Sequence, residues 1–254
     1  HWSEPVKVDI FRPDTASWEA RMKTIYLVRH GENHANITKE FSHRYIDYSL
    51  TEKGREQARQ TARWFAGHLV DRVFASPLKR TQETALPIAE LHGLPVETVE
   101  ELREVNVGTL EVEGDLAENW RLHNTIVTGW IAGEPETRMP GGENLHELRG
   151  RVRRAFGHIL DLTVRSAVVV SHGGVLAFGT PAVADVNGFD LRTEHHNCSI
   201  TRIDFLNGIP GRVRSWARWD HLTGEAAEVI SGVLRPDGEA AHDPVAGEAI
   251  GDTL

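Results

Sequence analysis

Two short apolar runs constrain the fold of this chain more than any other feature. Residues 24–29 read Thr-Ile-Tyr-Leu-Val-Arg, and residues 167–171 read Ala-Val-Val-Val-Ser. Continuous apolar runs of this length are typical of strands that are buried on both faces of a parallel sheet. Both runs end on a histidine followed by glycine, in Arg29-His30-Gly31 and Ser171-His172-Gly173. The sequence therefore predicts polar groups at the carboxyl ends of two buried strands.

Helical segments separate these strands. Apolar residues recur at helical spacing over residues 50–69 and 143–162. A short strand is expected at 71–75, and Ser76-Pro77 after it is a good N-cap with proline in the first helical position. Pro87 is expected to kink or shorten that helix.

The order of the elements defines the fold class. Two later runs, at 199–206 and 212–219, alternate in the manner of edge strands. The series β, α, β, α, α, β implies an α/β fold of three layers, αβα, with a mainly parallel central sheet and an antiparallel edge.

Charge and length divide the chain into three parts. Residues 1–21 precede Met22 and are expected to be an extension, either native or added. Residues 22–222 are long enough for one large domain. Residues 223–254 hold seven acids and one base, which is −6 of the formal charge of −9, and are expected to form a loosely held acidic tail.

Composition excludes several classes of function. A net charge of −9 argues against binding to nucleic acid or to an anionic membrane. No run approaches the roughly 18 apolar residues of a membrane span, and the first residues lack a signal peptide, so a cytoplasmic location is expected. Cys198, the only cysteine, cannot form an internal disulfide and is expected in the core or a cavity wall.

The two strand ends predict one binding site. In open α/β sheets, ligands bind beyond the carboxyl ends of the strands. If the two strands are neighbours, His30 and His172 face one pocket, and Gly31 and Gly173 allow a ligand close to the backbone. Either histidine alone would more simply cap its strand, but the repeated arrangement favours a site.

These residues belong to a longer series of motifs. The chain resembles the histidine phosphatase superfamily, also called the phosphoglycerate mutase-like proteins, and more closely its phosphatases. The resemblance covers roughly residues 24–220 and rests on Arg29-His30-Gly31-Glu32, Asn36, the run from Asp47 through Leu50-Thr51 and Gly54 to Gln57-Ala58, Ser76-Pro77-Leu78 with Arg80 and Thr84-Ala85, Glu104 with Gly108, Pro140-Gly141-Gly142-Glu143, and Ser171-His172-Gly173.

The resemblance implies a phosphohistidine mechanism, which elementary chemistry supports. Phosphoryl transfer needs fixed hydrogen-bond donors and positive charge. The guanidinium groups of Arg29 and Arg80 are the best candidates, because each can donate two parallel hydrogen bonds to a phosphoryl group. His30 is the nucleophile if its second nitrogen donates to a backbone carbonyl. His172 is expected to hold the phosphoryl oxygens as a protonated imidazole.

Two further residues complete the expected machinery. Asn36 adds a neutral donor to the phosphoryl group. Glu104 is expected to protonate the leaving alkoxide, for which its carboxyl must stay protonated near neutrality, and then to activate water. Without the resemblance, Glu104 would be taken for a solvated acid of the charged run 100–104. Glu101 and Glu111 are the alternative acids.

Three activities stay open. Hydrolysis of a small phosphorylated metabolite is favoured over mutase-type transfer, because only 39 positions separate Glu104 from Glu143 and Arg121 is the one nearby base between residues 111 and 135. A catalytically weak binding or signalling protein is the third reading. Arg44 and Tyr45 stand where mutases have a Ser-Gly pair, and they are expected either to bind a second anionic group or to be exposed.

Other features are given structural roles. The 14 histidines show no ligand spacing, so neither a metal nor a cofactor is expected, and both a monomer and a homodimer are compatible with the sequence. Residues 195–197 are expected at the rim of the pocket, and Trp120 and Trp130 as a lid or wall. The arginines of the long helix, Arg151, Arg153 and Arg154, are expected on a solvated face.

Overall fold

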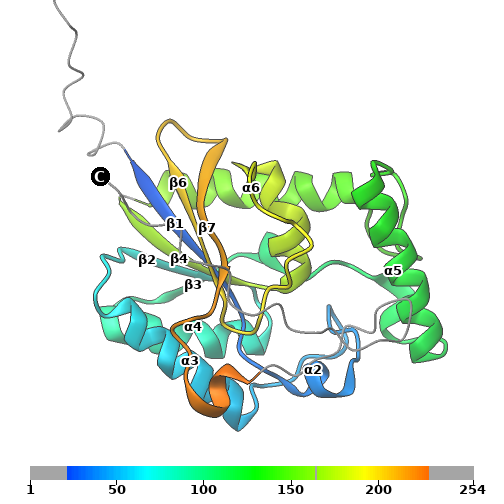
Figure 1. Ribbon diagram of the computed structural model, residues 1–254, viewed down its shortest axis with the longest axis horizontal. Helices are drawn as coiled ribbons and strands as arrows, with labels where there is room; N and C mark the ends of the chain where they lie inside the picture. The colour runs from blue at the N-terminus through cyan, green and yellow to red at the C-terminus, as the bar shows by residue number, and fades with distance from the viewer. Residues whose placement is uncertain (1–21, 164, 229–254) are drawn as a thin grey trace, which may run out of the picture.

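A twisted mixed sheet forms the centre of the protein. The computed structural model describes residues 22–163 and 165–228, so the predicted extension and most of the acidic tail lie outside the described residues. Within those ranges the sheet has seven strands in the order β3-β2-β4-β1-β6-β7-β5 (Figure 1). The strands are β1 (Lys23–Arg29), β2 (Arg72–Ala75), β3 (Val96–Thr98), β4 (Ser166–Ser171), β5 (Ala184–Asp185), β6 (Ile200–Phe205) and β7 (Gly211–Arg218).

The pairing of β1 with β4 determines where the site lies. The two strands are parallel and in register from Thr24 opposite Ser166 to Arg29 opposite Ser171, which confirms that they are neighbours. Their carboxyl ends therefore lie side by side. The antiparallel pairing lies beyond β1, where β6 runs antiparallel to both β1 and β7. Strands β6 and β7 form the predicted antiparallel edge of the sheet, beyond which the two-residue strand β5 pairs with β7.

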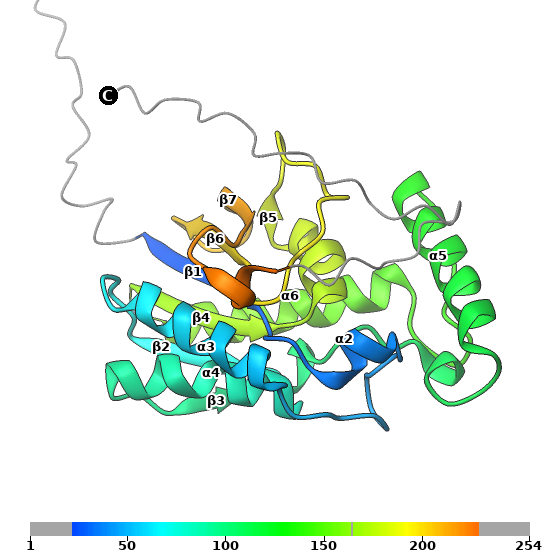
Figure 2. The same ribbon diagram turned by 60° about the horizontal axis from the view of Figure 1, so that its bottom comes forward.

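Helices cover both faces of the sheet and give the three layers that the sequence predicted. Helices α3 (Glu52–Phe65) and α4 (Lys79–His92) lie on one face, and α6 (Leu145–Leu162) lies on the other, with α5 (Leu116–Ala132) beyond it (Figures 1 and 2). Alternate residues of the strands face opposite layers. Ile25 and Leu27 belong to the core with α6, whereas Tyr26 and Val28 belong to the core with α3 and α4. Burial on both faces explains why these strands are continuous apolar runs.

Local capping sets the helix boundaries. Asn144 begins α6 through a capping box with Glu147, in which each side chain accepts from the other residue's backbone N–H. Helix α4 begins later than predicted, after Leu78, so Ser76 is not its N-cap. Pro87 lies inside α4 without shortening it, because the helix continues to His92.

The fold continues past residue 222. The short 3-10 helix η5 (Gly224–Ala227) packs on α3, where the amide of Gln57 donates to the carbonyl of Ala226 at 3.0 Å. Lys53 Nζ donates to the carbonyl of Glu228 at 2.7 Å. Residues 223–228 are thus part of the packed structure, contrary to the prediction of a loosely held tail from 223. In the described part of the chain, no helix has the length and apolar character needed to cross a membrane.

Candidate active site

The ends of β1 and β4 bring His30 and His172 together. His30 is 4 % exposed and His172 is fully buried, and their ring centroids lie 5.2 Å apart. The backbone N–H of His30 donates to the carbonyl of Ser171 at 3.0 Å, which extends the β1–β4 pairing into the site. The parallel register therefore fixes the position of both rings through the main chain.

The hydrogen bonding of His30 defines its tautomer. Its Nδ1 lies 2.7 Å from the carbonyl oxygen of Gly31. Because a carbonyl oxygen only accepts, Nδ1 carries the proton and Nε2 keeps its lone pair. Burial lowers the pKa of His30 well below its usual range, and the nearby charges of Arg80 and Arg29 lower it further. His30 is therefore neutral at neutral pH, with the ring nitrogen that a nucleophile requires.

His172 differs from the prediction in its charge. Burial lowers its pKa well below the usual range, and the charge of Arg80 adds to that effect, so the ring is neutral rather than protonated at neutral pH. Its Nε2 lies 2.8 Å from Ser76 Oγ. Among the described residues its buried Nδ1 has no hydrogen-bond partner. An unpaired buried nitrogen on a ring 5.2 Å from that of His30 is the kind of group that a ligand oxygen would satisfy.

Two arginines, Arg80 buried and Arg29 partly buried, bring positive charge to the histidines. Arg80, on α4, is 2 % exposed and donates to the carbonyl of Ser42 at 2.7 Å and to its hydroxyl at 3.0 Å. Burial lowers the pKa of Arg80 to about 10, so its guanidinium stays charged. Arg29 donates to the carbonyl of His195, while its Nε is buried and unpaired in the described part of the structure. Both arginines line the same cavity as His30.

Glu104 reaches the cavity from a segment that belongs to no helix or strand. Its carboxylate accepts from the backbone N–H of Val105 at 2.8 Å and of Val175 at 3.3 Å. Val175 follows the turn after β4, so this acid is tied to the strand end that carries His172. Glycine is required at position 174 in that turn, because a Cβ there would lie 2.8 Å from Glu104 Oε1.

Arg151 on α6 holds the Glu104 segment and was wrongly predicted to be solvated. It donates to the carbonyls of Glu101 at 2.6 Å, Arg103 at 2.7 Å and Glu104 at 3.1 Å. It also forms a bidentate pair with Glu143, at 2.7 and 3.0 Å. Because Glu143 in turn accepts from the backbone N–H of Asn106 at 2.9 Å, the pair holds the chain on both sides of Glu104.

The other arginines of α6 divide between two environments. Arg153 donates to the carbonyl of Ala182 at 3.0 Å, so its guanidinium is anchored to the protein although the residue is exposed. Arg154 is exposed as predicted.

Glu111 has a structural role and is not placed as the acid. Its carboxylate accepts from the backbone N–H groups of four consecutive residues, 43–46, at 2.8–3.1 Å. Burial alone would raise the pKa of Glu111, but these four donors lower it below its usual range. The loop that it holds carries Ser42, the partner of Arg80.

The remaining predicted residues fall into two groups. Asn36 lines the cavity, and its Oδ1 accepts from the backbone of Asn33 at 3.0 Å and from the amide of Asn197 at 3.2 Å. These bonds orient its Nδ2 as a donor. The structure does not place Gly31, Gly173, Arg44 or Tyr45 among the lining residues, and His172 lies buried behind His30 rather than among them. Arg44 and Tyr45 are exposed.

Gly31 is required for a different reason from the predicted one. A Cβ at Gly31 would lie 2.6 Å from the carbonyl oxygen of Gly54 on α3. The residue therefore permits the close approach of a helix rather than of a ligand.

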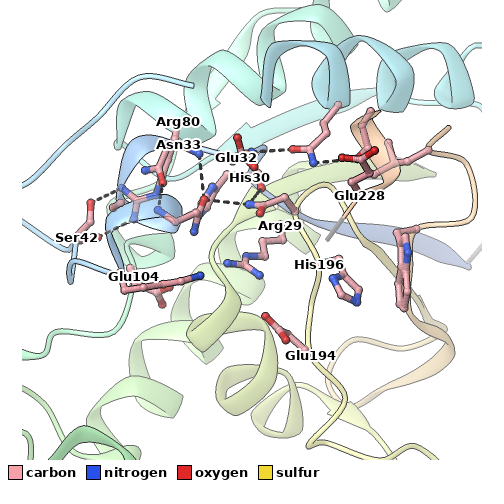
Figure 3. Close-up of a pocket in the computed structure, with 18 of the residues that line it drawn as sticks. Arg29, His30, Glu32, Asn33, Ser42, Arg80, Glu104, Glu194, His196 and Glu228 are labelled. Carbon is pink, nitrogen blue, oxygen red and sulfur yellow. Dashed lines mark hydrogen bonds between the residues drawn. The ribbon is translucent and has the colours of Figure 1, made fainter. Parts of the chain in front are cut away.

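The rim of the cavity was only partly predicted. His196, Asn197 and Trp120 line it, and Figure 3 labels His196. Trp130 lies in the core, 4 % exposed, and His195 is buried with its ring 4.8 Å from Trp216. Sequence reasoning missed several charged, polar and aromatic side chains that line the cavity and come from loops without a motif. They are Lys39, Glu40, Ser42, Glu194, Trp219 and Glu228.

The structure places Cys198 in the core. Cys198 is buried, and burial raises the pKa of its thiol to about 12, which fits the predicted core position and not a nucleophile. Among the described residues, no group of three or more His, Cys, Asp or Glu side chains is arranged to hold a metal ion.

Comparisons with known proteins identify the family of this chain. The sequence model of the histidine phosphatase superfamily (branch 1) matches residues 25–217. A protein of Enterobacter sp. (strain 638) described as "Probable phosphoglycerate mutase GpmB" is 37 % identical over 196 residues, which cover 72 % of this chain and 86 % of that protein.

Solved structures share the fold. The crystal structure of phosphoglycerate mutase from Bacillus anthracis has a TM-score of 0.68 at 20 % identity and covers 81 % of this chain and 97 % of its own. A putative alpha-ribazole-5'-P phosphatase from Escherichia coli has a TM-score of 0.61 at 25 % identity and covers 76 % of this chain and 94 % of its own. This chain belongs to the histidine phosphatase superfamily.

Proposed function

We propose that this chain is a phosphomonoesterase that hydrolyses a small phosphorylated metabolite through a phosphohistidine on His30. The observation that carries the proposal is the fixed tautomer of His30, whose Nδ1 donates to Gly31 while Arg29 and Arg80 lie in the same cavity. This combination supplies a neutral nucleophile beside two donors for a phosphoryl group.

In the first step, His30 Nε2 forms a bond to phosphorus and the bond from phosphorus to the ester oxygen breaks. Arg29, Arg80 and the amide of Asn36 stabilise the charge on the equatorial oxygens. Glu104 gives its proton to the departing alkoxide, which leaves as the alcohol. His172, whose ring centroid lies 5.2 Å from that of His30 and whose buried Nδ1 has no partner among the described residues, would donate to the same phosphoryl group once the substrate is bound.

In the second step, the Glu104 carboxylate takes a proton from water as the water oxygen bonds to phosphorus. The bond from phosphorus to His30 Nε2 breaks, and inorganic phosphate leaves. The roles of acid and base in the two steps belong to one carboxyl group, as microscopic reversibility requires. The Arg151–Glu143 pair holds that group in place through both steps.

Mutase-type transfer is the second candidate, because the Enterobacter relative is described as a probable phosphoglycerate mutase. A mutase must hold a second anionic group while the phosphoryl group returns to its substrate. Arg121 is the one lysine or arginine between residues 111 and 135. It is exposed on α5 and pairs with Glu118 at 3.6 Å. It does not line the cavity, which supports hydrolysis.

A panel of phosphate esters tests the proposal. We expect phosphate release from several esters without a 2,3-bisphosphoglycerate primer, at a rate that a chelator leaves unchanged. Interconversion of phosphoglycerate isomers that requires the primer, with little phosphate release, would instead identify a mutase. A chain with no turnover in either assay would be the binding or signalling member of the family.

A further inference from the structure

The cavity has opposite charges at its floor and at its mouth. The floor carries Arg29 and Arg80 and is the part of the cavity that the phosphoryl group of a substrate would occupy. The mouth carries the carboxylates of Glu40, Glu194 and Glu228. Figure 3 shows Glu194 and Glu228 on the His196 side of the cavity, and Arg80 with Ser42 on the other side.

Two of the three mouth carboxylates lack partners. Among the described residues, no hydrogen bond or ion pair within 4.0 Å reaches the carboxylate of Glu194 or of Glu228, and both residues are exposed. Glu40 accepts from Thr38 Oγ1 at 2.5 Å and from the Tyr48 hydroxyl at 3.3 Å, and no ion pair within 4.0 Å reaches it from the described residues.

Cations do not balance these acids. Lys39 is the one lysine or arginine among the lining residues outside the floor, in the described part of the chain. Its pKa is lowered by burial, while the charge of Glu194 opposes that shift, and the same carboxylate also raises the pKa of Arg29 on the floor. The mouth thus has three carboxylates against one ammonium group, and Arg44, the base predicted to bind a second anion, is not part of it.

Aromatic rings line the uncharged part of the mouth. Trp120 uses its indole N–H to bond the carbonyl of Lys39 at 2.7 Å, so it presents an apolar surface. Trp219 packs against His196 with ring centroids 3.9 Å apart. Aromatic walls with nearby carboxylates suit an alcohol group that carries hydroxyl or ammonium donors.

We propose that the preferred substrate is a phosphate ester whose alcohol part carries hydrogen-bond donors and no second anionic group. This inference rests on the proposed function, because it assigns the floor to the transferred phosphate. A second carboxylate or phosphate on the alcohol would lie beside unpaired carboxylates and be repelled, whereas an amine or polyol would find acceptors.

Binding tests the inference separately from turnover. Calorimetry on His30→Gln would compare three esters of similar size: phosphoethanolamine, glycerol 3-phosphate and 3-phosphoglycerate. Glu194 and Glu228 are exposed, so each contributes only a weak charge interaction with the ligand. Together they should make phosphoethanolamine bind about tenfold more tightly than 3-phosphoglycerate at low salt. Glycerol 3-phosphate should fall between them.

Charge-neutral variants locate the effect. On the same background, Glu194→Gln combined with Glu228→Gln should bring the ratio close to one. Glu90→Gln, an exposed glutamate of α4 outside the cavity, is the matched control and should keep the full ratio. Equal or tighter binding of 3-phosphoglycerate, or an unchanged ratio in the double variant, would overturn the inference.

Turnover by the unmodified chain keeps the two proposals apart. Hydrolysis of all three esters with no preference in binding would leave the phosphatase standing and remove the substrate class. The predicted binding order without phosphate release would support the substrate class and remove the phosphatase.

Discussion

The two sides of the reacting centre are built by different means. On the nucleophile side, the register of β1 with β4 and a bond from His30 to its neighbour Gly31 position the histidines through the main chain. On the acid side, Glu104 lies in an irregular segment that side chains of α6 hold from outside, through Arg151 and Glu143. The proposed nucleophile is therefore fixed by the sheet, whereas the proposed acid depends on a side-chain network and is easier to displace by mutation.

The largest expected effect separates the two sides chemically. Glu104→Gln removes proton transfer but keeps the size of the side chain, so hydrolysis of an alkyl phosphate should slow by about 10²–10⁴. Formation of phosphohistidine from nitrophenyl phosphate should largely survive, because nitrophenolate needs little protonation. Rapid-quench kinetics should then show a burst of nitrophenolate followed by slow turnover.

A neighbouring acid provides the control for that experiment. Glu101→Gln changes a carboxyl group that is three residues away and does not line the cavity. Its rates should stay close to those of the unmodified chain. If Glu101→Gln shows the selective loss and Glu104→Gln does not, the acid has been assigned to the wrong residue.

The next largest effect concerns the network that holds the acid. Arg151→Met should slow alkyl ester hydrolysis by about 10- to 100-fold, because a shift of the acid of about 1 Å is enough for such a loss. The nitrophenyl ester should lose much less, and Arg151→Lys should recover part of the rate. Arg154→Met, on the exposed face of the same helix, is the matched control.

Stability must be measured alongside these rates. Removal of Arg151 leaves the Glu143 carboxylate without its partner, so thermal unfolding should confirm that each variant is folded at the assay temperature. A folded Arg151→Met protein that loses the same factor with both esters would contradict a positioning role for Arg151.

The sequence predicted the side that the main chain builds. Continuous apolar strands, their neighbouring positions and the polar residues at their ends follow from local chemistry and from the geometry of parallel sheets. The sheet, its helices and the meeting of His30 with His172 were therefore predictable. The boundary of α4 was not, because Ser76 bonds His172 rather than capping the helix.

The side-chain network was not predictable for a physical reason. Arg151 stands on the polar side of an amphipathic helix, where a solvated side chain is the usual outcome. Its partners, the carbonyls of the Glu104 segment, lie more than 40 residues away and carry no sequence signal. The mouth of the cavity was missed in the same way, because Glu194 and Glu228 come from loops that only the fold brings together.

A smaller effect is expected at Glu111, which holds the loop beside Arg80. Glu111→Gln replaces a carboxylate that accepts four backbone N–H groups by a neutral amide, which is a weaker acceptor and whose NH₂ would face the N–H of Arg44 that now bonds Oε2. We expect a loss of about 1–3 kcal/mol in the free energy of unfolding at pH 7. Urea denaturation would measure it.

The same variant has a defined pH dependence. Because the pKa of Glu111 is lowered in the folded protein, its contribution is complete above the usual glutamate pKa of about 4.3 and is lost as the pH falls through the folded value. The difference in stability between the variant and the unmodified chain should therefore shrink below about pH 4. A difference that stays constant down to pH 3 would show that the carboxylate charge is not responsible.

The smallest effect is expected at Arg44. Its side chain is exposed and lies near the Tyr45 ring, with its guanidinium carbon 5.9 Å from the ring centroid. Arg44→Ala should leave kcat/KM within about twofold for singly and doubly charged esters, since isolated surface charges contribute little. A selective rise in KM for doubly charged esters would restore Arg44 to the substrate site.

We propose that His30 forms a covalent bond to phosphorus and that water then breaks it. Brief incubation with ³²P-labelled nitrophenyl phosphate, an alkaline quench and peptide mapping would detect that bond directly. Glu104→Gln should increase the trapped fraction, because it slows hydrolysis of phosphohistidine while the nitrophenyl ester still phosphorylates His30. We expect an acid-labile phosphate on His30 that disappears with release of inorganic phosphate. Label on Ser76, or no labelled residue in a single turnover that does release phosphate, would contradict it.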